Sequence, residues 1–409
     1  MRIMVSNVGS SSFKYQVIDM ETETTLTRGA VERVGNPPSL FTHSVPGRED
    51  LEMEIHALDH GSAIKRVIEA ILDPGSGVLK DLSELAGVGF KTVFARGITS
   101  SALITEDVIN ALEDYIPLAP FHNPAYIAAI RAFQEILPDK PLVAVFETWF
   151  HETIPDYAYI YSVPYEWYEK YGVRRYGFHG ASHRYISERV PQILKTPAEK
   201  LKIISCHLGG SSSLCAIKYG KSVDTSMGFS AQSGVLQSTR CGDIDPFIIP
   251  YIMDKEDLST DELREILAKR SGMLGISGVG SDMRDLQEAA SPVRRDSQST
   301  KKGNRRALLT IKTYNYGVKK YIGAYAAAMG GLDVLAFTGG IGERSASCRA
   351  EICEGLEFLG VKIDAEKNRS NIGEGGISSE DSRVRVLVIP ANEEIVVARE
   401  TARIISGGV

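Results

Sequence analysis

Two segments far apart in the chain share one pattern of hydrophobic and polar positions. Residues 3–18 and residues 202–217 each contain an apolar strand, a turn rich in Gly and Ser, and a strand in which apolar and polar residues alternate. This order predicts a β-hairpin in each segment. Backbone N–H groups in such turns are unobstructed by Cβ atoms and can bind an anion. One such turn alone would indicate an ordinary hairpin, but its recurrence predicts an internally duplicated, two-domain phosphate-binding protein.

Helical periodicity alternates with these strands, which favours an α/β fold. The pattern predicts helices over residues 63–72, 106–112, 123–136, 307–329 and from about 393 to 405. Continuous apolar runs predict buried strands at 335–338 and 386–389. The first of these strands enters a Gly-rich turn before a helix, where contacts with phosphate or ribose are favoured.

The composition fits a folded protein and excludes several classes. Hydrophobic residues make up 43% of the 409 residues, so a sizeable core can form, and the length favours two or three domains. The formal net charge of −6 argues against a general binder of nucleic acids or anionic membranes. Five Cys without CxxC spacing, no long apolar segment and no signal-peptide pattern predict a reduced, cytoplasmic protein without a zinc site.

Two stretches of unusual composition are compatible with a binding role, but an ordinary structural role is favoured for each. Residues 294–306 are basic, yet no aromatic residues interleave with the charges, so a solvated loop is favoured over a nucleic-acid site. Residues 146–171 contain both Trp and many Tyr. Packing in the core or at a subunit interface is favoured for this aromatic stretch.

Two motifs contain candidates for anion or metal binding. His179 and His183 have the i, i+4 spacing that can place two metal ligands on one helix face, but no Glu follows the first His. A role for His179 as a hydrogen-bond donor to an anion is therefore favoured. Arg240 lies between small residues, where a tight turn could present it to phosphate oxygens. Asp243 or Asp245 could instead hold Arg240 in a structural ion pair, and the local sequence leaves both interpretations open.

Acidic residues near two helix starts are further candidates. Asp282 could accept hydrogen bonds from ribose hydroxyls and Arg284 could stack on a base, but a helix N-cap with an ordinary ion pair is the alternative. Glu393 and Glu394 follow a strand, where a carboxylate could bind magnesium. Paired acids in a first helical turn also occur because they interact favourably with the helix dipole.

Six motifs, spread over nearly the whole chain, together resemble the acetate kinase family. They are residues 7–12 (NVGSSS), 175–183 (RYGFHGASH), 224–228 (DTSMG), 239–246 (TRCGDIDP), 339–343 (GGIGE) and 392–394 (NEE). They occur in the family's order and spacing. The resemblance implies an α/β fold of two domains with the duplicated ribonuclease H-like core of sugar kinases, actin and heat-shock ATPases, and an active site in the interdomain cleft.

The resemblance also implies an activity and its partners. The family transfers the γ-phosphoryl group of ATP reversibly to a short-chain carboxylate, acetate or a relative such as propionate, with Mg²⁺ (or Mn²⁺), giving an acyl phosphate and ADP. Residues 1–150 with a C-terminal helix at 391–409 would form an acceptor and phosphate domain, and residues 151–390 the nucleotide-binding domain. A cytoplasmic homodimer with small-molecule partners, and with no nucleic acid or membrane, is expected.

By resemblance, the catalytic residues are Glu147, His179 and Arg240, of which the last two would stabilise the phosphoryl group during transfer. Asn7 and Glu393 would bind the metal. The residues that would bind the nucleotide are Lys14, His207, Leu208, Gly209, Gly210, Ser211, Asp282, Met283, Arg284, Gly340, Ile341, Gly342, Glu343 and Arg344.

The chain departs from the family pattern around the implied acceptor pocket, to which Lys91 and Phe178 would belong. Glu147 replaces the family's Asp and reaches one methylene further. Lys91 replaces an Arg, which keeps the charge but loses the bidentate fork, and Arg96 nearby could substitute for it. Further departures lie at residues 210–211, 230–234 and 344. The loop at 339–343 persists, and this favours ATP because family members that use pyrophosphate have lost that loop.

Three hypotheses follow from the motifs and the departures. The favoured one is an ATP-dependent acyl kinase for acetate or a close relative. The second is a kinase of the same fold with a larger or more polar acceptor, motivated by Lys91, Arg96 and Gln232. The third is a nucleotide-binding regulatory protein with weakened catalysis, motivated by Glu147 and Lys91.

Overall fold

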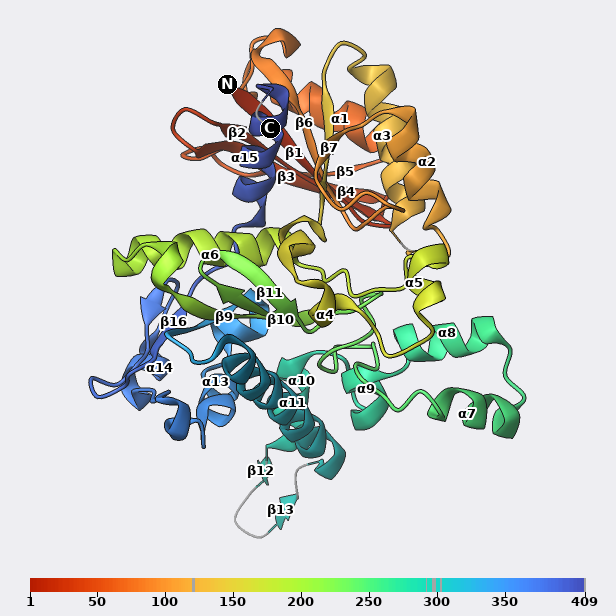
Figure 1. Cartoon of the computed structure of the whole chain (residues 1–409). Helices are drawn as coiled ribbons and strands as arrows, with labels where there is room; N and C mark the ends of the chain where they lie inside the picture. Colours follow the sequence, from red (N-terminus) through yellow and green to blue (C-terminus); the bar gives the residue numbers. More distant parts are fainter. Residues whose placement is uncertain (120–121, 292, 296–298, 302–303, 408–409) are drawn as a thin grey trace. The chain divides into compact units, whose positions relative to one another are not determined.

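Figure 1 shows the computed structural model, which describes residues 1–407 except 120–121, 292, 296–298 and 302–303. The chain divides into two compact units. The first unit comprises Met1–Glu152 and Asn392–Val409, and the second comprises Thr153–Ala391. Each unit contains a mixed β-sheet and its own hydrophobic core.

The sheet of the first unit has eight strands in the order β5-β4-β3-β2-β1-β6-β8-β7. Their bounds are β1 Arg2–Val8, β2 Ser12–Asp19, β3 Thr24–Glu32, β4 Ser39–Ser44, β5 Leu51–Ile55, β6 Leu85–Thr92, β7 Ala102–Leu103 and β8 Leu142–Phe146. β1, β2 and β3 are antiparallel neighbours, whereas β6 runs parallel to β1 and β8 parallel to β6. The hairpin β1–β2 is the one predicted for residues 3–18, and it places Asn7 opposite Lys14.

Helices cover both faces of this sheet. They are α1 His60–Leu72, α2 Glu106–Asp114, α3 Asn123–Ile136 and α15 Glu393–Ile405, with a short 3₁₀-helix at Leu82–Glu84 and another at Trp149–Thr153 that ends at the unit boundary. α1 and α3 pack on the face that carries Met4, Phe13 and Phe90. α15, from the end of the chain, packs against β1, β6 and β8 on the other face. The four helices predicted in this unit are confirmed.

α15 lies directly against β6 because glycines on that face have no side chains. Gly87, Gly89 and Lys91 alternate along β6 and therefore share one face of the sheet. A Cβ atom on Gly89 would lie 3.1 Å from Val397 Cγ1 of α15. The close approach brings Glu393, the first residue of α15, to Lys91.

The sheet of the second unit has six strands in the order β11-β10-β9-β14-β16-β15. Their bounds are β9 Lys202–Leu208, β10 Ser212–Lys218, β11 Lys221–Thr225, β14 Val334–Thr338, β15 Gly375–Gly376 and β16 Arg385–Val388. β11-β10-β9-β14-β16 repeats the order and the strand directions of β3-β2-β1-β6-β8. The predicted duplication of an α/β core is therefore confirmed.

The second unit has more helices than the first. They are α4 Asp156–Tyr159, α5 Tyr165–Tyr171, α6 Gly180–Leu194, α7 Ile248–Glu256, α8 Thr260–Lys269, α9 Gly272–Ser277, α10 Met283–Ala290, α11 Arg305–Met329, α12 Gly339–Arg344, α13 Ala346–Cys353 and α14 Ala365–Ser370, with 3₁₀-helices at Ala198–Lys200 and Glu357–Leu359. α11 packs its buried side chains against the core face of β9 and β10. The helix predicted at 307–329 is confirmed. A Gly-rich turn was predicted between β14 and the following helix, but α12 begins directly at Gly339, so no separate turn precedes it.

Three further expectations can be compared with the fold. The basic stretch was expected to be a solvated loop, but β12 Val293–Arg295 and β13 Ser299–Lys301 pair as antiparallel strands. Residues 296–298 and 302–303 of this stretch lie outside the described residues.

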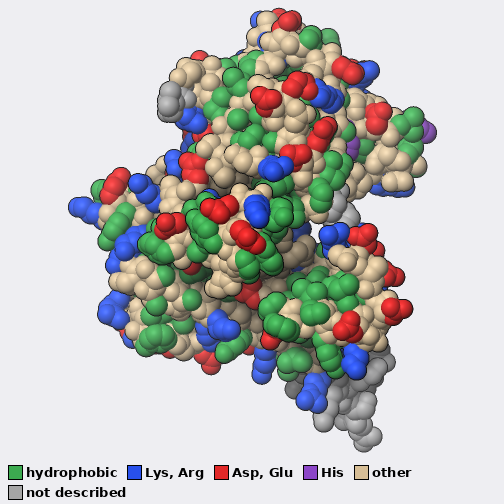
Figure 2. Space-filling model, turned by 45° about the vertical axis from the view of Figure 1, so that its right-hand side comes forward, with side chains coloured by type: hydrophobic (Ala, Val, Ile, Leu, Met, Phe, Trp, Pro, Cys, Tyr) green, Lys and Arg blue, Asp and Glu red, His purple; other side chains and the backbone are tan. Residues whose placement is uncertain are grey.

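On the face shown in Figure 2, acidic and basic side chains of the described residues are interspersed. Phe150 is buried but Tyr157 is 83% exposed, so the aromatic stretch is only partly core. No described helix is long and apolar enough to cross a membrane.

Gly89→Ala should destabilise the protein, because the added Cβ would collide with α15. We expect a loss of about 1–3 kcal/mol in the free energy of unfolding, the usual cost of overpacking. Urea unfolding measures it. Gly323→Ala in α11 is the control, because no atom lies within 4 Å of the added Cβ. Equal stability of Gly89→Ala and wild type would show that α15 does not depend on this contact.

Candidate functional site

The carboxyl ends of β9 and β14 lie side by side, because the two strands are parallel neighbours with Thr338 opposite His207. The turn Gly209–Ser211 after β9 and the first turn of α12 therefore meet at one edge of the sheet. Gly339 has φ of +76°, and a Cβ atom there would lie 2.8 Å from the carbonyl oxygen of Leu208. Only glycine fits this position. The fold thus brings together two segments that the sequence predicted separately as nucleotide-binding.

Arg240 reaches the β9–β10 turn from a following loop. Its Nη1 donates to Ser211 Oγ at 3.1 Å and to Gln237 Oε1 at 3.2 Å. The N–H of Ser238 donates to the carbonyl oxygen of Gly210 at 2.9 Å, which joins the loop to the turn. These contacts hold a guanidinium group next to backbone that the sequence predicts to bind phosphate.

The structure favours one of the two interpretations of Arg240. Asp243 accepts hydrogen bonds from the N–H of Gly234 at 2.7 Å and from the Tyr321 hydroxyl, and Asp245 accepts from a backbone N–H of its own turn. Within the described part of the chain, no carboxylate forms an ion pair with Arg240. Burial lowers the pKa of Arg240, but a guanidinium group remains protonated at neutral pH. Its charge is therefore available to a bound anion.

His179 contacts the same hairpin. Its Nδ1 lies 2.8 Å from Ser213 Oγ, and its ring stacks on that of His207 with the centroids 4.2 Å apart. His179 directly precedes α6 and has φ of +58°, a left-handed conformation that is uncommon for a residue other than glycine. Such backbone strain is typical of positions that a functional site requires. Phe178, next to it, is 4% exposed.

His183 has a structural role. It is fully buried, with Nδ1 2.9 Å from Ser205 Oγ and Nε2 2.8 Å from Ser213 Oγ. Its two ring nitrogens therefore face serines, which does not support a metal pair with His179. The described residues contain no group of three or more His, Cys, Asp and Glu suited to a metal ion. Ser213 instead links the two histidines.

The segment after β14 contains both structural and accessible residues. Glu343 Oε1 accepts from the N–H groups of Gly339 and Ala391, at 2.9 and 3.0 Å, and so joins the ends of β14 and β16. Gly342 is buried, whereas Gly340 is exposed. Apart from its chain neighbours and the backbone of α12, no atom lies within 4 Å of a Cβ atom added to Gly340, so packing against other segments does not require this glycine.

Asp282 is the N-cap of α10. Its Oδ1 accepts from the N–H of Arg284 at 2.8 Å, and Arg284 Nη2 donates to its other oxygen at 2.7 Å. The side-chain bond from Arg284, followed by the backbone bond, lowers the pKa of Asp282 to about 2. The interpretation as an N-cap with an ion pair is confirmed, and contact with adenosine stays a prediction. Met283 is buried, Ile341 is partly buried and Arg344 is exposed.

In the first unit, a lysine lies between two carboxylates at the carboxyl ends of β6 and β8. Lys91 Nζ pairs with Glu147 Oε1 at 3.4 Å and donates a hydrogen bond to Glu393. Glu147 directly follows β8, where its N–H donates to the carbonyl oxygen of Thr92 at 2.8 Å. Burial alone would lower the pKa of Lys91, but the two carboxylates outweigh it, and the pKa is raised above its ordinary value. Lys91 is therefore a cation at neutral pH.

Arg96 does not join this cluster. Its Nη1 pairs with Asp114 at 3.2 Å, and both side chains are more than half exposed. The proposal that Arg96 substitutes for the family's arginine is therefore not supported. Lys91 is the basic residue that the fold places beside Glu147.

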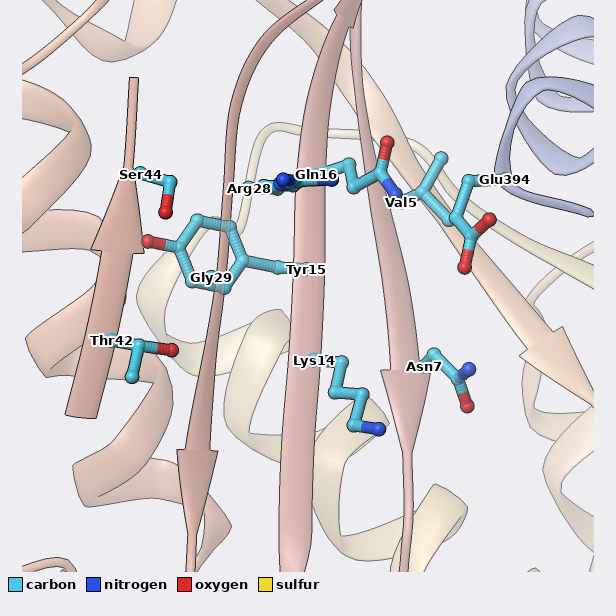
Figure 3. A pocket seen from close by; sticks show the side chains of 10 residues that line it. All are labelled: Val5, Asn7, Lys14, Tyr15, Gln16, Arg28, Gly29, Thr42, Ser44 and Glu394. Carbon is cyan, nitrogen blue, oxygen red and sulfur yellow. The ribbon is translucent and has the colours of Figure 1, made fainter. Parts of the chain in front are cut away.

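A cavity of about 260 Å³ in the first unit is lined by Asn7, Lys14 and Glu394 (Figure 3). Asn7 and Lys14 are paired across β1 and β2, so their side chains share the face of the sheet on which α15 packs. Glu394 comes from the start of α15, next to Glu393. The predicted metal ligand and the predicted phosphate ligand thus line one cavity together with Glu394, the second residue of α15.

The oxygen donors of the first unit fit a magnesium ion that a substrate also helps to bind. Mg²⁺ in such sites takes one or two carboxylates together with phosphate oxygens and water. Glu147 and Glu393 already converge on one positive charge, the ammonium group of Lys91. Asn7 supplies an amide oxygen on the same face of the sheet. A divalent cation would therefore meet favourable electrostatics there.

Three residues support the site although the sequence analysis assigned them no role. Gln237 binds Arg240 and Ser213 binds His179. Tyr126 of α3 is buried close to Lys91, and burial raises the pKa of this tyrosine above its ordinary value. The contacts of Ser213 and Tyr126 join distant segments, which spacing along the chain does not reveal, whereas Gln237 lies three residues before Arg240.

Comparisons with known proteins agree on one family. The model of the acetokinase family matches residues 2–399. An acetate kinase of Thermoanaerobacter pseudethanolicus is 50% identical over 408 residues, which is 100% of each chain. The crystal structure of Porphyromonas gingivalis acetate kinase has a TM-score of 0.89 at 40% identity and covers 99% of each chain. That of a Francisella tularensis propionate kinase has a TM-score of 0.88 at 36% identity and covers 98% of each chain.

Lys91→Met should remove a positive charge from between two carboxylates, Glu147 and Glu393. We expect a loss of about 3 kcal/mol in the free energy of unfolding, as for a buried ion pair with one partner removed. Because a divalent cation can replace the lost charge, millimolar Mg²⁺ should raise the Tm of this variant more than that of the wild type. Lys170→Met, at an exposed ion pair, is the control. If Mg²⁺ raised the Tm of Lys91→Met and of the wild type equally, this would contradict the assignment of a divalent-cation site to Glu147 and Glu393.

Proposed function

The chain belongs to the acetokinase family, and we propose on that premise that it transfers the γ-phosphoryl group of ATP reversibly to acetate, giving acetyl phosphate and ADP. ATP-dependent transfer of phosphate to a carboxylate is the reaction of the family and of this chain. Acetate is the proposed acceptor because the relative with 50% identity is an acetate kinase. Propionate is the proposed alternative because a propionate kinase shares the fold at 36% identity.

The main support for the proposal is that the side chains of Arg240 and His179 both contact the glycine-containing hairpin β9–β10. Arg240 contacts the turn at Ser211, and His179 contacts the strand that follows it at Ser213. A carboxylate nucleophile is ionised at pH 7, because carboxyl groups have pKa values near 4. The reaction therefore needs little general-base catalysis, and positioning and charge stabilisation dominate. Arg240 and His179 would bind the phosphoryl group as charge moves across it.

The nucleotide would bind at the carboxyl edge of the second sheet. Residues 207–211 would contact phosphates through backbone N–H groups, while residues 282–284 and 340–344 would form the adenosine pocket. Lys14 would contribute a positive charge from the first unit. The exposed Gly340, which packing does not require, supports the adenosine assignment.

A divalent cation, Mg²⁺ or Mn²⁺, would be held by Glu147, Glu393 and Asn7. When bound, it would neutralise phosphate charge. Glu147 would orient the reacting groups from the end of β8. With these carboxylates bound to the cation, the ammonium group of Lys91 would be available to the acceptor carboxylate. Phe178 would form an apolar wall for the methyl group of the acceptor.

The two units would divide these tasks between them. We propose that residues 1–150 with 391–409 carry the acceptor and metal groups and that residues 151–390 bind the nucleotide. A cytoplasmic homodimer is also proposed. The exposed aromatic side chains of α4 and α5, such as Tyr157 and Tyr171, support a subunit interface.

A hydroxamate assay with ATP, Mg²⁺ and a panel of short-chain carboxylates tests the function. We expect acyl hydroxamate from acetate with the highest kcat/KM, and a fall of about 10²–10³ in kcat for Arg240→Ala, the usual effect of removing a charge-stabilising donor. Arg264→Ala, an exposed arginine paired with Asp261, should retain full activity. If no carboxylate gave acyl hydroxamate, the proposed function would be wrong. If a larger carboxylate gave a higher kcat/KM than acetate, acetate would not be the preferred acceptor.

Gly340→Ala tests the adenosine pocket. The added methyl group meets no protein atom within 4 Å, so the Tm should not change. If the nucleotide lies against this backbone, KM for ATP should rise about tenfold while KM for acetate stays constant. Gly323→Ala serves as control. An unchanged KM for ATP would show that Gly340 does not belong to the adenosine pocket.

A further inference from the structure

Gln237 joins the loop of Arg240 to the β9–β10 turn, and no part of its side chain is exposed. Its Oε1 accepts hydrogen bonds from Arg240 Nη1 at 3.2 Å and from Ser211 Oγ at 2.8 Å. Its Nε2 donates to the carbonyl oxygen of Ala231 at 2.8 Å. The same residue closes the turn through its backbone, because its N–H donates to the carbonyl oxygen of Arg240 at 3.2 Å.

The orientation of this amide is determined by its partners. A carbonyl oxygen can only accept hydrogen bonds, so the Ala231 side requires the NH₂ group of Gln237. A guanidinium group can only donate, so the Arg240 side requires the amide oxygen. Each end of the amide therefore has the partner it needs. A buried, satisfied amide of this kind holds its neighbours in one arrangement.

The charge of the amide is as important as its geometry. Gln237 is neutral, and within the described residues Arg240 has no carboxylate partner, so its positive charge is retained. A carboxylate at the position of Gln237 could hold the guanidinium as well or better, because charge-assisted bonds are stronger. It would also cancel the charge that a phosphoryl group requires.

We propose that Gln237 is a positioning residue that orients Arg240 towards the transferring phosphoryl group without neutralising it. The inference rests on the proposed function, in which Arg240 binds that group. Ser211 completes the arrangement, because it accepts from Arg240 and donates to the same amide oxygen. Gln237 itself does not contact substrate in this mechanism.

The test compares Gln237→Glu and Gln237→Leu with a matched control. Gln237→Glu keeps the size and the oxygen that accepts from Arg240, replaces the NH₂ group with a second oxygen and adds a negative charge. Gln237→Leu removes all hydrogen bonds of the side chain. Gln192→Glu is the control, because Gln192 also accepts from an arginine, Arg189 Nη1 at 2.9 Å, but on the exposed surface of α6. The readouts are kcat and KM for ATP in the hydroxamate assay and Tm from thermal unfolding.

We expect kcat of Gln237→Glu to fall at least about tenfold while KM for ATP changes little, since the interaction lost is made mainly in the transition state. Its Tm should fall as well, because a second oxygen replaces the NH₂ group that donates to the carbonyl oxygen of Ala231. Gln237→Leu should lose kcat as well, with a lower Tm. Gln192→Glu should match the wild type in all three quantities.

Two results would overturn the inference alone. One is wild-type kcat in Gln237→Glu. The other is a rise in KM for ATP in Gln237→Glu that is as large as the fall in kcat, which would show that the lost interaction is not specific to the transition state. A wild-type protein that makes no acyl hydroxamate would instead overturn the proposed function, and the inference would fall with it.

Discussion

The parallel pairing of three strands in each unit is the constraint on which the candidate site depends. β1, β6 and β8 are parallel neighbours in the first unit, as are β9, β14 and β16 in the second. Parallel strands end at the same edge of a sheet, so residues that follow different strands become neighbours. This places Glu147 beside Lys91 in one unit and Gly339 beside Leu208 in the other. The duplication therefore repeats an arrangement of strand ends while the chemistry at those ends differs.

The two edges hold their cations in different ways. Lys91 lies between Glu147 and Glu393, so its charge is more than balanced by acids and the cluster suits a divalent metal. Arg240 is held by a serine hydroxyl and an amide, so its charge is retained for an anion. A protein with a net charge of −6 can therefore bind a polyanionic nucleotide, because the local arrangement of neutral and charged groups determines the site.

Much of the fold and part of the site could be predicted from the sequence. The two hairpins, the helix at 123–136 and the long helix ending at Met329 follow from periodicity that tertiary packing did not override. Motif spacing predicted Arg240 and His179 as candidate site residues, but it could not decide whether Asp243 pairs with Arg240. That choice depends on Tyr321 and Gly234, which lie elsewhere in the chain. The pairing of β12 with β13 was not predicted, because the basic composition of this stretch indicates exposure to solvent and says nothing about backbone pairing.

Hydrogen–deuterium exchange with and without Mg·ATP tests directly whether the strand-end turns of the second unit bind the nucleotide. We expect slower exchange at the N–H groups of residues 207–211 and 339–344, with surface helices such as α8 unchanged. Slower exchange elsewhere, with both of these segments unaffected, would contradict it.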